Sequence, residues 1–129
     1  MTSTQSPEKR LQYTMKLYCE DRVYPDMKKL REVLTQLSDE QKLHILQQKY
    51  SVWTPLRYAA IRDHTGIISS LLTSLQSSAD RLKVLMSSKH STPLHIAAHY
   101  GRTESVKMIL DCLTADQQIR IMSVQSISG

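Results

Sequence analysis

The sequence has 129 residues, enough for one domain, and its 40% hydrophobic and 22% charged residues are ordinary for a globular protein. The absence of a long apolar run argues against a membrane span, and the first residues lack the basic and apolar regions of a signal peptide. We therefore expect a cytoplasmic protein, with the nucleus as the alternative, whose formal net charge of +5 favours acidic partners.

The first part of the chain predicts a helical unit after a short disordered lead over residues 1–7. Leu37 lies 38 residues before Leu75, in phase with later units, and Pro25 suits a turn between two helices. We expect Cys19, in a segment that fits a capping role, and the distant Cys112 to be reduced core thiols. The apolar residues that keep helical spacing are Met27, Leu30, Val33, Leu34 and Leu37.

A seven-residue phrase occurs twice in the chain. In each copy the Thr is a candidate N-cap and the Pro takes the first helical position, so each copy predicts a helix start. The paired alanines keep the helix thin, which favours close packing between neighbouring units. The phrase Thr54-Pro55-Leu56-Arg57-Tyr58-Ala59-Ala60 returns 38 positions later as Thr92-Pro93-Leu94-His95-Ile96-Ala97-Ala98.

A second helix is predicted after each copy of the phrase. Gly101, which readily adopts a left-handed conformation, precedes the helix that begins near Thr103, and Asp63, which tolerates that conformation better than most residues, stands at the same position in the first copy. A Ser or Thr cap followed by an apolar run then occurs in all three connections, and each predicts a short extra helical turn. These connecting segments cover residues 38–46, 77–85 and 114–122.

The repeated phrase resembles the ankyrin repeat, whose units begin with Thr-Pro-Leu-His-x-Ala. The second copy matches every one of these residues, and the first departs only at Arg57, where the family has His. The resemblance implies an all-α solenoid of stacked helix-turn-helix units with hairpin-like loops, here with short extra helices in the connections. Residues 8–129 then comprise a degenerate N-terminal capping repeat (8–50), two repeats (51–87 and 88–122) and the start of a truncated repeat (123–129).

The resemblance also implies a binding surface. Partners of ankyrin repeats contact the hairpin loops and the exposed side of the first helices, which together form the concave face. Trp, Tyr and Arg are the residue types that most often anchor interfaces. The corresponding positions are Lys49, Tyr50, Trp53, Arg57, Ile61, Arg62, Lys89, His90, Ser91, His99 and Tyr100. We expect them to bind a segment of a partner protein, and the basic charge favours an acidic one.

Other interpretations of these residues stay open. Packing between loops would also explain Trp53 and Tyr50, and ordinary solvated charges would explain Arg62 and Lys49. Nucleic acid is a weaker alternative partner, because the sequence has no recognised nucleic-acid module and no long Lys/Arg run.

No residue pattern indicates catalysis or a cofactor. His95 and His99 have the i, i+4 spacing of two metal ligands, but no Cys, Asp or Glu stands near enough in sequence to complete a four-ligand set. Nothing resembles a nucleophile elbow or a phosphate-binding Gly loop. The sequence therefore predicts a non-catalytic interaction module without metal or cofactor. The alternative is a structural spacer within a larger repeat array.

The end of the chain predicts an uncovered repeat face. The sequence stops before the next Thr-Pro would fall, so we expect the N-terminal part of a longer repeat protein. Exposed apolar patches tend to bind something, which makes self-association through this end a further hypothesis. The apolar residues expected there are Ile109, Leu113, Ile119 and Met122.

Overall fold

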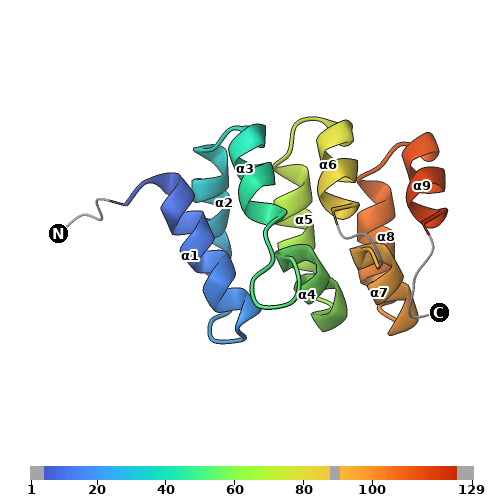
Figure 1. The fold of residues 1–129 in the computed structure, drawn as a ribbon, viewed down its shortest axis with the longest axis horizontal. Helices are drawn as coiled ribbons and strands as arrows, with labels where there is room; N and C mark the ends of the chain where they lie inside the picture. Colours follow the sequence, from blue (N-terminus) through green and yellow to red (C-terminus); the bar gives the residue numbers. More distant parts are fainter. Residues whose placement is uncertain (1–4, 88–90, 125–129) are drawn as a thin grey trace.

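The computed structural model describes residues 5–87 and 91–124, and helices joined by short loops make up this part of the chain (Figure 1). Its helices repeat in threes, so that α1–α3, α4–α6 and α7–α9 form units 1, 2 and 3. The helices in these ranges are α1 (Pro7–Cys19), α2 (Met27–Thr35), α3 (Asp39–Leu46), α4 (Pro55–Arg62), α5 (Thr65–Thr73), α6 (Ser78–Leu85), α7 (Pro93–His99), α8 (Thr103–Asp111) and α9 (Ala115–Met122).

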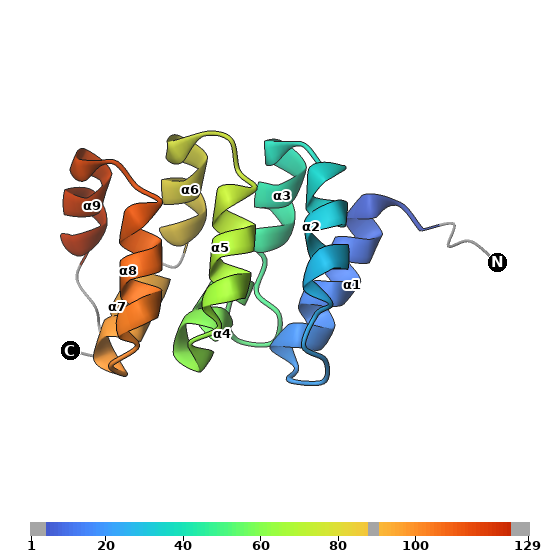
Figure 2. The ribbon, with the colours of Figure 1, turned by 180° about the vertical axis from the view of Figure 1, so that it is seen from behind.

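The three units stack side by side and form three rows of helices. The first helices α1, α4 and α7 make one row, and the second helices α2, α5 and α8 make another, which lies in front in Figure 2. The extra helices α3, α6 and α9 form a third row along the upper edge of both views. This arrangement confirms the predicted all-α solenoid.

The first helices of units 2 and 3 begin as predicted at Pro55 and Pro93, but their caps differ. The Thr92 hydroxyl accepts a hydrogen bond from the His95 amide at 3.2 Å and lies 2.7 Å from His95 Nδ1. Thr54 makes no side-chain cap hydrogen bond, contrary to the prediction, and Arg57 stands where the second copy has His95. In unit 1, α1 begins at Pro7 with Ser6 as its N-cap, inside the predicted lead.

The first helices of all three units end in the same way. Asp21, Asp63 and Gly101 have positive φ angles of 59°, 58° and 69°, which confirms the left-handed residues predicted in units 2 and 3. The amide of the next residue donates back into the helix in each case: Arg22 to the Leu17 carbonyl at 2.9 Å, His64 to Ala59 at 2.9 Å and Arg102 to Ala97 at 2.8 Å. These are Schellman motifs, so α1 is built like α4 and α7 although unit 1 lacks the repeated phrase.

The short extra helices predicted in the connections are present, with eight residues each. Ser38 and Thr114 form complete capping boxes with Gln41 and Gln117. Ser77 accepts only from the amide of Ala79, and the box is incomplete because the fourth residue, Asp80, has a shorter side chain than Gln.

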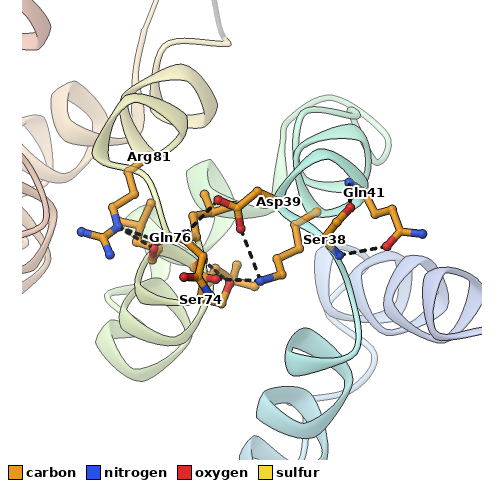
Figure 3. A network of polar contacts seen from close by, with 10 residues as sticks. Ser38, Asp39, Gln41, Ser74, Gln76 and Arg81 are labelled. Atoms are coloured by element: carbon orange, nitrogen blue, oxygen red, sulfur yellow. Dashed lines mark hydrogen bonds and ion pairs between the residues drawn. The ribbon is translucent and has the colours of Figure 1, made fainter.

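Polar side chains on the third row join it to the second row (Figure 3). Lys42 is only 3% exposed; its Nζ donates to the Ser74 carbonyl of unit 2 at 2.6 Å and lies 3.7 Å from Asp39 Oδ1. Asp39 in turn accepts from the Gln76 amide at 2.9 Å. Arg81 takes the place of Lys42 in unit 2, and its Nε donates to the Leu72 and Leu75 carbonyls at 3.0 Å. The buried charge of Lys42 is thus paired and hydrogen-bonded, as burial requires, and the half-buried Arg81 is hydrogen-bonded to two carbonyls.

One apolar core runs through the stack from Leu11 in α1 to Ile121 in α9. Two residues predicted to be exposed at the C-terminal end belong to it, because Ile109 is 0% and Leu113 8% exposed. Ile119 and Met122 are exposed, at 61% and 54%.

Candidate partner-binding surface

The loop before α4 presents an exposed apolar side chain at its tip. The Tyr50 amide donates to the Trp53 carbonyl at 2.9 Å, which closes a tight hairpin over Ser51 and Val52. Ser51 has a φ of 74°, a conformation that favours glycine, and Val52 is 65% exposed. Val52 was not among the predicted residues; its place between Tyr50 and Trp53 in a predicted loop was the signal that could have identified it.

Tyr50, at the base of this hairpin, is half-buried. Its hydroxyl donates to the Ile45 carbonyl at 3.0 Å and lies 3.1 Å from Gln48 Oε1. Burial raises the pKa of Tyr50 to about 12, so the hydroxyl remains protonated at neutral pH. The Tyr50 side chain therefore fixes the hairpin to the end of α3, while Lys49 beside it is exposed.

Aromatic rings and guanidinium groups form a ladder along α4. Arg57 lies over the Trp53 ring at 4.6 Å from its centroid, and the Trp53 and Tyr58 rings are 5.5 Å apart. Arg62, one turn further on, lies 4.9 Å from the Tyr58 centroid. Three residues predicted to bind partners are thereby brought together on one side of α4, and Tyr58 has the structural role expected for it.

The ladder continues into unit 1 through Arg62. Its guanidinium donates to the Tyr18 carbonyl at 2.6 Å and to the Cys19 carbonyl at 3.1 Å, and it lies 4.8 Å from the Tyr18 ring centroid. Burial raises the pKa of the Cys19 thiol to about 12, so this buried free cysteine is a neutral thiol. The Arg62 side chain thus connects unit 2 to unit 1. Its contact with a partner stays a prediction.

The end of α7 presents a second exposed side chain, which is aromatic. Tyr100 is 50% exposed, and its ring meets that of the exposed His99 edge-on at a centroid distance of 4.9 Å. Ile61, at the equivalent end of α4, is half-buried, and its carbonyl accepts from Arg102 Nε at 3.0 Å. His99 and Tyr100 are therefore available to solvent, whereas Ile61 is partly covered by unit 3.

The remaining predicted residues lie in the loop before α7. Ser91 is 7% exposed, which leaves little of its side chain for a partner. Lys89 and His90 lie outside the described residues, so their part in binding stays a prediction.

The two histidines considered as metal ligands make other contacts in the structure. His95 Nδ1 is engaged with the Thr92 hydroxyl at 2.7 Å, and His99 packs on Tyr100. Over residues 5–87 and 91–124, no three His, Cys, Asp or Glu side chains are grouped closely enough to hold a metal ion. None of the helices described in the same ranges is both long and apolar enough to cross a membrane.

Comparison with known proteins places the repeat units in a family. The family model described as ankyrin repeats (3 copies) matches residues 27–121, from the start of α2 to the last turn of α9. No curated protein and no solved structure matches the chain significantly. The family match covers more than half of the sequence and agrees with the three stacked units and their Schellman ends. The chain therefore belongs to the ankyrin-repeat family.

Proposed function

We propose that this chain is a non-catalytic module that binds a segment of a partner protein across the hairpin 49–53 and the ends of α4 and α7. Ankyrin repeats are generally protein–protein interaction modules. The observation that carries the proposal for this chain is a pair of exposed side chains, Val52 and Tyr100, which are 65% and 50% exposed. Exposed apolar and aromatic groups of this kind anchor interfaces when they stand on rigid elements.

The hairpin has the features of a rigid element. A non-glycine residue in the left-handed region costs about 1–3 kcal/mol, so Ser51 keeps its φ of 74° only because the surrounding contacts hold it there. Those contacts are the Tyr50–Trp53 bridge and the stacking of Trp53 against Arg57 and Tyr58. Strain of this kind gathers at binding sites, where it projects a side chain that the partner recognises.

The two anchors are a short distance apart. Val52 precedes α4, whose eight residues span about 12 Å, and neighbouring helices pack about 8–10 Å apart. A partner segment of about five extended residues would cover the resulting diagonal of roughly 15 Å. Lys49 and Arg57 near its start favour acidic residues in that segment, in keeping with the net charge of +5.

The proposal assigns different tasks to the predicted residues. Val52, Lys49, His99 and Tyr100 are the contacting residues, and Trp53 with Arg57 supports the hairpin and borders the surface. We expect Arg62 to contribute through the fold, because its guanidinium is bound to carbonyls of unit 1. The cytoplasm or nucleus is the expected compartment, since Cys19 and Cys112 are free thiols.

A displayed library of random peptides tests the surface. We expect selection on the chain to enrich peptides with acidic and apolar residues, and Val52→Asp or Tyr100→Ala to weaken a selected peptide at least about tenfold, as for an interface hot spot. Val23→Asp is the matched control, because Val23 is also exposed, at 48%, but lies in the loop before α2. Peptides that bind the Val52 and Tyr100 variants as well as the unchanged chain would refute this surface.

The alternatives give other results in the same assay. A structural spacer would enrich no peptide above background. Binding to nucleic acid would lose affinity steeply with added salt because phosphate contacts release counterions. Peptide binding would lose less, because salt screens only the attraction of its acidic residues and not the contacts with Val52 and Tyr100.

A further inference from the structure

A cavity of about 360 Å³ lies between units 1 and 2, with residues of α2 and α3 on one side and of α5 and its C-cap on the other. Leu34 and Lys42 form its floor and are 1% and 3% exposed, whereas Arg31 on α2 and Thr73 on α5 are exposed at its mouth. Small-molecule sites have volumes of roughly 300–1,000 Å³, so this cavity has the size for a small ligand.

The side of the cavity that belongs to unit 2 is more polar than the equivalent part of unit 3. Ser70 and Ser74 line the cavity, and the residues 38 positions later are Met108 and Cys112. Cys112 belongs to the apolar core, and Met108 packs against it. Unit 2 therefore has hydroxyl groups, and at Ser70 a much smaller side chain, where unit 3 has apolar packing.

The floor of the cavity holds a buried ammonium group with unused hydrogen-bonding capacity. Lys42 Nζ has three N–H donors. One donates to the Ser74 carbonyl at 2.6 Å (Figure 3), and Asp39 Oδ1, at 3.7 Å, forms an ion pair but lies beyond hydrogen-bonding distance. The described part of the chain gives Lys42 no other acceptor. Unpaired donors on a buried charge are costly, so an acceptor that enters the cavity is favoured.

Arg31 and two hydroxyl groups add further donors. Over residues 5–87 and 91–124, neither the Arg31 guanidinium nor the hydroxyls of Ser69 and Ser70 make a hydrogen bond or an ion pair. A guanidinium binds two phosphate oxygens at once, and a hydroxyl can donate to a third. None of the described residues that line the cavity is acidic, and the two cations outnumber the one carboxylate that is paired with Lys42. The donors and the charge therefore favour a phosphate group.

Other hydroxyl groups of the cavity are acceptors. Thr35, Thr73 and Ser74 each donate to a carbonyl three or four residues earlier in the chain, at 2.6, 2.6 and 2.8 Å. A hydroxyl has a single hydrogen, so these three oxygens are left only with lone pairs to offer a ligand. They match a ligand that carries hydroxyl groups of its own.

We propose that the cavity between α2 and α5 binds a small phosphorylated polyol, such as a sugar phosphate, with its phosphate near Lys42 and Arg31 and its hydroxyl groups near Thr35 and Thr73. The ligand would contact units 1 and 2 together, which couples its binding to the stability of the stack. The cavity lies along the second helices, which are in front in Figure 2, and shares no residue with the hairpin 49–53 or the end of α7. The site does not depend on the peptide-binding surface proposed above.

Isothermal titration calorimetry of the full chain with the monophosphates of ribose, glucose and inositol tests the site. We expect one of them to bind at least about tenfold more tightly than inorganic phosphate, and the unphosphorylated polyols to give no measurable heat. Arg31→Ala removes a phosphate donor, and Ser70→Met places the side chain of unit 3 in the cavity. Each should raise the dissociation constant at least about tenfold. Lys28→Ala is the matched control, because Lys28 is an exposed cation on the same helix that does not line the cavity.

Thermal unfolding supplies a second readout. The bound monophosphate should raise the melting temperature of the original chain and not that of Ser70→Met. Circular dichroism checks that the helices of each variant are intact, and Arg31→Ala keeps the test valid if Ser70→Met does not fold, because Arg31 is exposed.

Several results would overturn the proposal. They are the absence of binding by all three monophosphates, equal weakening by Lys28→Ala, and undiminished binding by Arg31→Ala. Tighter binding of a phosphoserine peptide than of any free monophosphate would also overturn it, because the occupant would then be a protein. Peptide selection at the hairpin 49–53 does not depend on any of these results, so the two proposals fail separately.

Discussion

The two copies of the Thr-Pro-Leu phrase have the same backbone but different polar contacts around it. In unit 3 the Thr92 hydroxyl and the His95 ring bind each other at 2.7 Å. In unit 2 Arg57 replaces the histidine and stacks on Trp53, while Thr54 makes no side-chain cap bond. The replacement of the histidine by Arg57 is thus accompanied by a new contact, between Arg57 and Trp53.

The ends of α4 and α7 also differ by a replacement that is accompanied by a new contact. Unit 3 ends α7 with Gly101, the residue that the family places there, whereas unit 2 ends α4 with Asp63 in the same left-handed conformation. The aspartate accepts from Ser105, which is 0% exposed and stands where unit 2 has Ile67. Asp63, which departs from the repeat pattern, therefore makes a contact between units 2 and 3. Substitutions at such positions test whether the contact explains why the residue differs from the repeat pattern.

The largest expected difference between the copies concerns Arg62 and Tyr100, each of which directly precedes the left-handed residue. Arg62→Ala removes two charge-assisted hydrogen bonds to the Tyr18 and Cys19 carbonyls. We expect a loss of about 3 kcal/mol in the free energy of unfolding, because hydrogen bonds to charged groups contribute about 1.5–3 kcal/mol. Tyr100→Ala should change it by less than about 0.5 kcal/mol, because the side chain is exposed. Urea unfolding followed by circular dichroism measures both.

Arg62→Lys is the control that separates charge from geometry. A single ammonium group cannot bridge two carbonyls and stack on two rings, so this variant should recover less than half of the loss. Equal losses for Arg62→Ala and Tyr100→Ala would show that Arg62 does not hold units 1 and 2 together.

A smaller effect is expected at Asp63. Asp63→Gly relieves a left-handed aspartate but leaves the buried Ser105 hydroxyl without its acceptor, and we expect a net loss of about 1 kcal/mol. In a chain that already carries Ser105→Ala, the same change should stabilise by about 1 kcal/mol, because only the relief remains. Four urea unfolding curves complete this double-mutant cycle. A coupling energy near zero would show that Asp63 and Ser105 differ from the repeat pattern independently of each other.

Local signals in the sequence predicted most of the fold. The phrase at residues 54–60, its return, and the Ser or Thr caps of the connections each specify a helix from residues a few positions apart. The apolar spacing of residues 27–37 predicted a degenerate first copy. The sequence did not predict the left-handed conformation of Asp21, which aligns α1 with the other first helices. Aspartate is common in turns of many kinds, so its presence near a turn does not indicate a positive φ angle.

The candidate site was less predictable because it depends on distant contacts. The role of Arg62 follows from the end of α1, more than 40 residues earlier in the chain. The exposure of Val52 follows from the φ angle of Ser51, and serine does not indicate a left-handed residue as glycine would. Ile109 and Leu113 were expected to be exposed at the C-terminal end of the stack, but apolar spacing alone does not tell which side of α8, and of the turn after it, faces the core.

The smallest expected difference between the copies is a pH dependence at His64, which occupies the position of Arg102. Burial and then the charge of Arg62 hold the pKa of His64 below 6.5, while Asp21 and Asp63 oppose this effect. Between the two pKa values the unfolded chain binds more protons, so the stability contributed by neutral His64 is lost as the pH falls below about 6.5. We expect the melting temperature to fall between pH 7.5 and 5.5, and less so in His64→Gln. An unaltered fall in His64→Gln would assign the pH dependence to other groups.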